Sequence, residues 1–336
     1  MSAQTVSAPE IDIQEIPRAR KRENVVLNLK AGDVVVVRSA REIAETLDEN
    51  GTLDSLPFMP EMLEYCGKQF RVLNRVVQST IDGAFLAGSH TESYVREFRN
   101  NDVVTLQTVR CSGAQHDKCQ RACAIFWKEA WLRKADDIAE VSESNGSSNS
   151  LPRNLHLKTT TQPGKYFCQS SEFLKATLHL PMGKRIKKCF SAIAARNISV
   201  WGMMKRLFAW AWWRTYYKLI GESVRGSLEK TPTGVLDLKP GDLVQIKSLP
   251  EIKATLNSRG RNRGLHFSAD QRPFCGQQFR VRNRADNFIA EGTGEMKHFQ
   301  NTVMLEDVLC DSACFAFGGC YRSDLLYWRE IWLRKI

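Results

Sequence analysis

The sequence predicts a mainly β protein of the α+β class, built from two tandem small SH3-like β-barrel modules and a helical connector. Three observations predict it. A stretch of about a hundred residues occurs twice. Each copy contains short β-branched runs that begin at a Gly-Asp turn. The segment between the copies occurs once and is rich in Lys, Arg and Trp.

The two copies keep a constant offset. Copy one begins LNLKAGDVVVVRS at Leu27 and copy two begins LDLKPGDLVQIKS at Leu236, so the copies are offset by 209 residues. The same offset pairs Cys66 with Cys275, in CGKQFRV and CGQQFRV. The copies end on similar motifs, FWKEAWLRK and YWREIWLRK. Matches of Gly, Cys and Trp in a fixed order indicate a duplication.

This repeat divides the chain into five predicted segments. They are a flexible tail at 1–24, repeat module one at 25–136, a flexible linker at 137–154, a basic Trp-rich helical connector at 155–233 and repeat module two at 234–336. The linker contains VSESNGSSNS, a composition typical of flexible chain. The tail has no apolar core of the kind that a secretory signal needs.

Within each module, local signals predict short strands around one short helix. DVVVVRS and DLVQIKS are β-branched strands. Ser39 with Glu42, and Ser248 with Glu251, are predicted to form capping boxes for the helix that follows. KQFRVLNRVVQSTI and VVTLQTV are predicted as further strands, and EAWLRK as the last. We expect four tryptophans of the closing motifs in the core: Trp127, Trp131, Trp328 and Trp332.

The positive charge is concentrated in the connector. The whole chain has a net charge of +11, whereas residues 151–240 alone contain 16 Lys or Arg against 4 Asp or Glu. A basic segment suits an anionic surface, such as acidic lipid, nucleic acid or an acidic protein, although a solvated face has the same composition. No apolar run is long enough to span a bilayer. We therefore expect a cytoplasmic protein, with peripheral attachment to the inner membrane face as the alternative.

Each copy carries its own set of cysteines. Ten cysteines without an export signal favour metal binding or redox chemistry over structural disulfides. We predict a tetrahedral zinc site with thiolate ligands in each module. The predicted ligands are Cys66, Cys111, Cys119 and Cys123 in module one, and Cys275, Cys310, Cys314 and Cys320 in module two. The fourth ligand does not transfer between the copies, because Asp324 occupies the position that matches Cys123.

Other uses of the cysteines stay open. An iron–sulfur cluster also takes four thiolates, but the spacings here are not its usual ones. Buried thiols and a thiol-based redox centre are further alternatives. His116 could replace one sulfur, although its polar loop, SGAQHDK, predicts an exposed side chain. Cys168 and Cys189 have no repeat mates; we expect core thiols, although Lys187 and Lys188 could lower the pKa of Cys189.

Two helical stretches are predicted in the connector. KYFCQSSEFLKATLHLP is predicted as an amphipathic helix that ends at Pro181. NISVWGMMKRLFAWAWWRTYYKLIG is predicted as a helix with an apolar stripe on one side and cations on the other. The stripe comprises Trp201, Met204, Phe208, Trp212 and Leu219, and the far side carries Arg206, Arg214 and Lys218.

Two interpretations of this stripe compete. We expect it to dock onto the barrels, whereas a helix in a membrane interface is the alternative. Nucleic acid would use the same residue types, but no recognised nucleic-acid motif is present. The predicted surface or partner-binding residues are Lys184, Arg185, Lys187, Lys188, Trp201, Lys205, Arg206, Trp210, Trp212, Trp213, Arg214 and Lys218.

The motifs do not indicate an enzyme. The sequence has no P-loop, GxGxxG, HExxH or GxSxG, and none of its six histidines matches between the copies. We therefore expect a non-catalytic, zinc-stabilised scaffold or adaptor that binds an anionic surface or a partner protein through the connector. The alternatives are a thiol-based redox enzyme or sensor, a peripheral membrane accessory protein and a nucleic-acid-binding protein.

Three segments resemble a family of bacterial tandem-repeat, cysteine-containing proteins. They are LPFMPEMLEYCGKQFRV, the C-x7-C-x3-C spacing before FWKEAWL, and LEKTPTGVLDLKPGDLVQIKS. The resemblance covers most of the chain after residue 25 and implies a bacterial source, but it implies no activity. Copy two departs from the pattern around Cys314, which weakens the prediction for its site.

Overall fold

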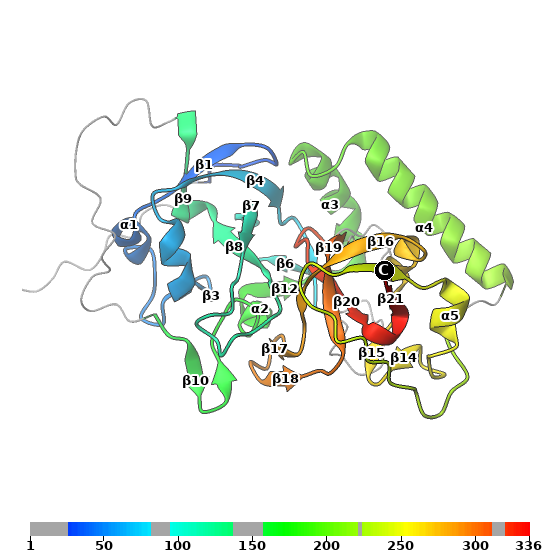
Figure 1. Ribbon diagram of the computed structural model, residues 1–336. Helices are drawn as coiled ribbons and strands as arrows, with labels where there is room; N and C mark the ends of the chain where they lie inside the picture. The colour runs from blue at the N-terminus through cyan, green and yellow to red at the C-terminus, as the bar shows by residue number, and fades with distance from the viewer. Residues whose placement is uncertain (1–25, 82–94, 137–156, 221–223, 311–319) are drawn as a thin grey trace, which may run out of the picture.

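Two β modules lie side by side in the computed structural model, which describes residues 26–81, 95–136, 157–220, 224–310 and 320–336 (Figure 1). Each module contains a five-stranded antiparallel sheet. The connector supplies two longer helices and several short elements. The protein is therefore mainly β with a helical segment, as the sequence predicts.

Module one pairs its first strand with its last in one five-stranded sheet. The strands are β1 (Val34–Val37), β4 (Gln69–Arg75), β7 (Val103–Arg110), β8 (Ala124–Lys128) and β9 (Leu132–Lys134), in the order β8-β7-β4-β1-β9. The 3₁₀ helix η3 (Glu129–Trp131) separates β8 from β9. The other elements are α1 (Ala40–Ala44), β2 (Thr52–Leu53), β3 (Leu56–Pro57), η1 (Pro60–Tyr65), β5 (Ser79–Thr80) and β6 (Val95–Phe98).

Module two has the same strand order and register. Its strands are β13 (Leu243–Ile246), β16 (Gln278–Arg284), β19 (Thr302–Leu309), β20 (Leu325–Arg329) and β21 (Leu333–Lys335), in the order β20-β19-β16-β13-β21. Val35 lies opposite Phe70 in module one, and Val244 lies opposite Phe279 in module two. The other elements are α5 (Leu249–Lys253), β14 (Arg261–Asn262), β15 (Leu265–His266), η5 (Ala269–Phe274), β17 (Asn287–Ile289), β18 (Met296–His298) and η6 (Glu330–Trp332).

The predicted capping boxes are confirmed in both modules. Ser39 and Glu42 start α1, and Ser248 and Glu251 start α5. In each box the serine side chain and the glutamate side chain satisfy backbone N–H groups at the helix start. The same local rule therefore fixes the chain path after the first strand of each module.

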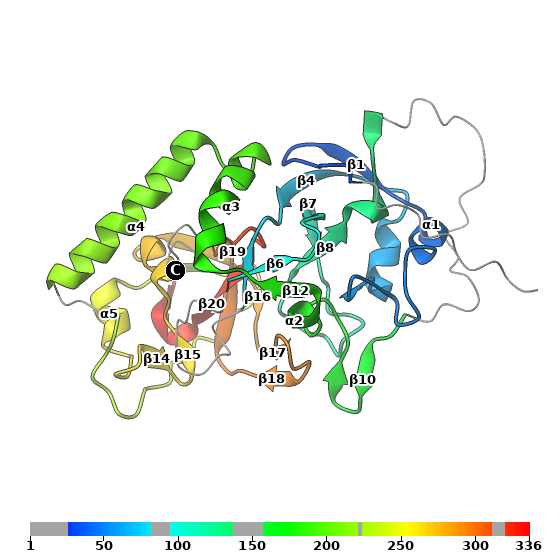
Figure 2. The same ribbon diagram turned by 180° about the vertical axis from the view of Figure 1, so that it is seen from behind.

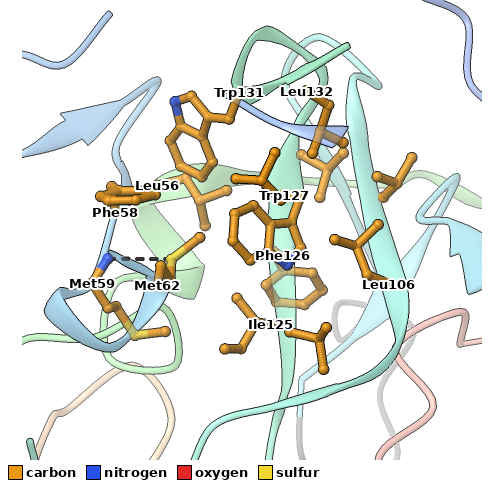
Figure 3. Packing of buried hydrophobic residues seen from close by; sticks show 14 of the residues in the cluster. Leu56, Phe58, Met59, Met62, Leu106, Ile125, Phe126, Trp127, Trp131 and Leu132 are labelled. Atoms are coloured by element: carbon orange, nitrogen blue, oxygen red, sulfur yellow. Dashed lines mark hydrogen bonds between the residues drawn. The ribbon is translucent and has the colours of Figure 1, made fainter. Parts of the chain in front are cut away.

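Tryptophans fill the centre of each module, as predicted. Trp127 and Trp131 are fully buried, and the ring of Phe58 lies edge-on to both (Figure 3). Their fully buried repeat mates in module two pack against Phe267 in the same way. Edge-on aromatic pairs of this kind contribute about 0.5–1.5 kcal/mol beyond their buried area. The closing motifs of the two copies therefore carry the core.

The first half of the connector packs onto module one. Instead of the predicted helix, it forms only α2 (Phe173–Ala176), followed by β12 (Thr177–His179), which pairs with β6. The helix prediction is wrong because tertiary contacts outweigh local periodicity here. Phe173 joins the core of module one, and Gln169 hydrogen-bonds the backbone of Phe126. Before α2, the chain forms a hairpin of β10 (Thr160–Gln162) and β11 (Lys165–Tyr166).

The second half of the connector forms a helical hairpin of α3 (Met182–Ala194) and α4 (Val200–Ile220). Its small core contains Cys189 and Ala192 of α3 and Met203 of α4, together with Val77 of module one and Tyr321 of module two. The hairpin therefore packs where the modules meet. In both views α4 runs along the outer edge of the molecule (Figures 1 and 2).

Equivalent residues of the two modules make reciprocal contacts across the module interface. The N–H of Gln120 donates to the carbonyl oxygen of Asn287 at 2.7 Å, and the N–H of Tyr321 donates to the carbonyl oxygen of Gln78 at 3.5 Å. Gln78 and Asn287 are repeat mates at the offset of 209. Gln120 directly follows Cys119 and Tyr321 directly follows Cys320, and these two cysteines align between the copies. The interface thus has the approximate two-fold symmetry of an isologous dimer within one chain.

Two buried arginines extend this symmetry. Arg121 donates to the carbonyl oxygen of Ile289 at 3.3 Å, and Arg322 donates to that of Thr80 at 3.1 Å. Both guanidinium groups also meet Glu291, with N–O distances of 3.6 Å and 2.6 Å. All three charged side chains are almost completely buried, so removing Glu291 takes away the carboxylate that both guanidinium groups share and leaves Arg322 with Asp324, 3.0 Å away.

We predict that Glu291→Gln destabilises the protein by about 3–5 kcal/mol, the usual loss when one partner of a buried ion pair is removed. Urea unfolding followed by tryptophan fluorescence measures the change. Glu295→Gln is the matched control, because Glu295 pairs with Lys297 at the surface and its loss should leave unfolding unchanged. An unchanged unfolding midpoint for Glu291→Gln would contradict the role given to this carboxylate.

Candidate functional site

The apolar stripe of α4 faces solvent. Trp201, Met204, Phe208 and Trp212 are 69%, 56%, 70% and 58% exposed. The prediction that this stripe docks onto the barrels is therefore wrong for these four residues, whereas the side chain of Leu219 lies outside the described part of the structure. Within the residues that the structure describes, no helix combines the length and apolarity needed to cross a bilayer. Among the residues that the structure describes, α4 presents an exposed aromatic surface.

The opposite face of α4 packs inward, which explains this orientation. Met203 is buried against Cys189 and Ala192 of α3. Because Trp201 and Phe208 lie on the opposite side of the helix from Met203, the packing of Met203 turns them toward solvent. Arg206, predicted to bind at the surface, is half-buried and interacts with the Tyr321 hydroxyl group of module two.

The exposed face of α4 combines aromatic rings with one described exposed cation, Lys205. The rings of Phe208 and Trp212 stack with centroids 6.3 Å apart and an interplanar angle of 21°. The Nζ atom of Lys205 lies 5.6 Å from the centre of the Trp201 ring, within cation–π range. On α3, Ile186 and Phe190 are also exposed.

The predicted cations fall into an exposed group and a buried group. Arg185 and Lys188 are buried, so their prediction as surface residues is wrong. Lys188 bonds Glu97 at 2.6 Å and the side-chain oxygen of Asn101 at 2.8 Å, because α3 turns this face toward module one. The exposed cations are Lys184, Lys187 and Lys205, and Trp210 is half-buried. The side chains of Trp213, Arg214 and Lys218 lie outside the described residues.

The four predicted zinc ligands of module one do not all lie within 4.8 Å of one another, although Cys111, Cys119 and Cys123 lie within electrostatic range of each other. Four sulfurs around one zinc would lie about 3.8 Å apart. Cys66 ends η1, and the sulfur of Cys119 instead accepts a hydrogen bond from the N–H of Ile289 at 3.4 Å. Burial raises the pKa of Cys123 at the module interface, and the nearby carboxylate of Asp324 raises it further.

Module two separates its predicted ligands in a related way. Cys275 ends η5. The sulfur of Cys320 lies 3.7 Å from the hydroxyl oxygen of Ser79 in module one. The sulfur of Cys310 lies 3.6 Å from a carboxylate oxygen of Asp270. Cys314 lies outside the described residues.

One mixed cluster does form in module one. Glu61 in η1, Cys111 after β7 and His116 in the following loop each place a ligand atom within 4.8 Å of the others. Among the described residues, this is the one group of three or more His, Cys, Asp or Glu side chains that meets this distance. Sequence reasoning missed Glu61, although the offset of 209 pairs it with another carboxylate, Asp270.

The loop after Cys111 turns His116 inward. His116 is only 1% exposed, so the prediction of an exposed side chain is wrong. Gly113 makes the turn possible: it has a φ of 72°, and a Cβ atom there would lie 1.9 Å from the carbonyl oxygen of Cys119. The polar composition of the loop therefore did not predict a buried imidazole, because the glycine lets the loop fold back on itself.

Burial disfavours the thiolate form of the described cysteines whose pKa is shifted. It raises the pKa of Cys66 to about 11 and that of Cys168 to about 11. Burial also raises the pKa of Cys189, although Arg206 acts in the opposite direction. The suggestion that Lys187 and Lys188 activate Cys189 is therefore wrong. Nucleophilic thiols need a lowered pKa, so this pattern does not favour redox chemistry.

A broad groove of about 1080 Å³ also lies on module two, lined in part by Arg261, Arg263 and Arg329. The guanidinium group of Arg329 donates to the carbonyl oxygens of Asn262, Arg263 and Gln300. Burial lowers the pKa of Arg329 to about 10. This side chain thus stabilises the local backbone.

Comparison of the chain with protein-family models, with curated proteins and with solved structures finds no match in any of the three. The functional assignment therefore rests on the geometry of the described residues.

We predict that Cys66 and Cys168 react slowly with a maleimide in the folded protein. A pKa of about 11 in place of 9 reduces the thiolate fraction at pH 7 by about 100-fold. Labelling should accelerate as the pH rises toward 11 and should become fast at neutral pH in urea. Timed labelling with peptide mass spectrometry measures both rates. Equal rates in folded and unfolded protein at pH 7 would show that these thiols are not protected.

Proposed function

We propose that this protein is a non-catalytic peripheral binding protein that attaches to an anionic lipid surface through α3 and α4. The observation that carries the proposal is the solvent-facing stripe of α4, which comprises Trp201, Met204, Phe208 and Trp212. In this proposal the two β modules form a rigid scaffold, each an SH3-like barrel. Support for the barrel comes from the pairing of β1 with β9 after η3, which closes a meander of antiparallel strands.

The stripe provides the apolar part of the binding energy. Moving a large apolar side chain out of water contributes about 1.5–3 kcal/mol when burial is complete. Trp201, Phe208 and Trp212 are each more than half exposed, so each retains most of that contribution. Exposed patches of this kind on a folded protein mark interaction sites.

The connector provides the electrostatic part. Lys184, Lys187 and Lys205 are exposed on the same two helices. A lysine near an anionic leaflet contributes about 1 kcal/mol, so three would contribute about 3 kcal/mol. Residues 151–240 hold 16 basic against 4 acidic residues, so the segment has a net positive charge that an anionic membrane attracts.

A lipid surface fits the exposed residues better than nucleic acid does. Tryptophan has an apolar body and a polar N–H, a combination that prefers the membrane–water boundary. Met204 on α4 and Ile186 on α3 gain from contact with acyl chains but offer little to bases or phosphates. The position of α4 along the outer edge of the molecule leaves this helix free to lie flat on a bilayer (Figure 2).

We predict that the protein co-sediments with phosphatidylcholine vesicles that contain about a quarter of phosphatidylglycerol, and much less with phosphatidylcholine alone. Trp201→Ala and Phe208→Ala should each weaken vesicle binding by about tenfold, which corresponds to about 1.4 kcal/mol. Raising the salt concentration should weaken binding further, because exposed charges are screened.

The controls for this experiment keep the fold unchanged. Val235→Ala removes an equally exposed apolar side chain (68%) outside the two helices and should bind vesicles like the parent protein. Circular dichroism should show that both aromatic variants remain folded, because neither side chain is buried. Vesicle binding that is unaffected by both aromatic substitutions would overturn the proposal. Preferential binding of an RNA oligonucleotide over anionic vesicles would overturn it as well.

A further inference from the structure

We infer that Glu61, Cys111 and His116 form a binding site for a single zinc-class divalent cation. Their ligand atoms come from three places in the chain and lie within 4.8 Å of one another. Glu61 and His116 are 8% and 1% exposed, so both polar groups sit deep in module one. This donor set differs from the four-cysteine site that the sequence spacing suggests, and it is independent of the lipid-binding proposal.

The imidazole of His116 is already oriented as a ligand. Its Nε2 atom lies 3.1 Å from the carbonyl oxygen of Phe167. Donation of the Nε2 proton to this carbonyl leaves Nδ1 with a lone pair, and Nδ1 has no hydrogen-bond partner among the described residues. Metal-binding histidines in proteins are held in this way, with one ring nitrogen on a carbonyl and the other on the ion.

The two carboxylate oxygens of Glu61 also differ, because one is hydrogen-bonded to the protein and the other is not. Its Oε2 atom accepts hydrogen bonds from the backbone N–H of Ser112 at 3.2 Å and from the Ser112 hydroxyl group at 3.3 Å. Its Oε1 atom is buried and accepts no geometrically good hydrogen bond within the described part of the chain, and the Cys111 thiol lies within hydrogen-bonding reach of the same carboxylate. Leaving a buried carboxylate oxygen and a buried ring nitrogen unsatisfied is costly, and a shared cation would satisfy both.

The chemistry of the donors selects the metal class. One thiolate, one imidazole and one carboxylate are all ligands that zinc accepts, whereas magnesium and calcium prefer oxygen donors alone. Zinc would take the three protein ligands and complete a tetrahedron with one further ligand, such as water.

A bound ion would stabilise a loop on which three parts of the chain converge. Glu61 belongs to η1 of module one, and the ring of His116 contacts the connector through Phe167. Farther along the same loop, the side chain and backbone of Gln120 bond Asn287 of module two. The ion would therefore cross-link the loop that meets module two.

Two of the three ligand positions are repeated in module two. Asp270 and Cys310 are the repeat mates of Glu61 and Cys111, and the Cys310 sulfur lies 3.6 Å from an Asp270 carboxylate oxygen. The position that aligns with His116, counted back from Cys320, is Phe317. Module two thus keeps the carboxylate and the thiol but lacks the histidine. It therefore provides an internal comparison for the zinc site.

The decisive experiment is zinc X-ray absorption on protein purified without a metal-affinity tag. The inferred site predicts one sulfur at about 2.3 Å and nitrogen or oxygen donors at about 2.0–2.2 Å. Bound zinc measured by elemental analysis should be removed by a chelator and restored by adding zinc alone. A shell of four sulfurs would overturn the inference, and so would protein that neither contains zinc nor takes it up.

Five variants separate this donor set from the four-cysteine site. Cys111→Ser and His116→Ala should weaken zinc binding by more than about 100-fold, beyond the loss that an outer partner of a metal ligand causes. Cys66→Ser and the repeat-mate control Cys310→Ser should keep that zinc. Because His116→Ala removes a buried side chain, Glu61→Gln provides a variant of nearly unchanged shape that should also lose zinc. Zinc loss in Cys66→Ser, together with retention in Glu61→Gln, would contradict the inference.

Discussion

A buried carboxylate between two arginines sets how the modules meet. Glu291 contacts Arg121 of module one and Arg322 of module two, and the Arg322 guanidinium group also lies 4.7 Å from the ring centre of Phe173 in α2. Burial alone would lower the pKa of Arg322, but Asp324 and Glu291 raise it, so the side chain stays charged. Charges buried in this way are costly to separate, which restricts the modules and α2 to one arrangement.

That arrangement determines where the two candidate sites lie. Val77 and Tyr321, one from each module, line the surface onto which α3 and α4 pack. Once Met203 faces this surface, the geometry of a helix turns Trp201 and Phe208 to the opposite side. The same interface holds the loop that carries His116, because residues farther along that loop bond module two. The exposed helix face and the buried polar cluster are thus both consequences of how the duplicated modules join.

The sequence predicted what depends on short-range rules and on the repeat. The capping boxes, the core tryptophans and the helical character of α4 follow from local patterns that the structure keeps. The helical periodicity grouped Trp201 with Phe208 correctly, but it could not say which face would pack, because that depends on the packing of Met203. The burial of His116 was not predicted, because the way in which Gly113 lets the loop fold back on itself depends on tertiary structure. Glu61 was not predicted, because the spacing of the cysteines alone does not indicate a carboxylate from a distant part of the chain as a ligand.

The most direct test of the membrane proposal is quenching of tryptophan fluorescence by brominated lipids in phosphatidylglycerol-containing vesicles. Trp127, Trp131, Trp328 and Trp332 are fully buried and should be insensitive to the lipid, which makes them an internal reference. Quenching should therefore occur in the parent protein and should fall strongly when Trp201 and Trp212 are both replaced by phenylalanine, a change that keeps most of the apolar surface. Quenching that is absent, or that persists unchanged in the double variant, would contradict the proposal that α4 inserts into the lipid interface.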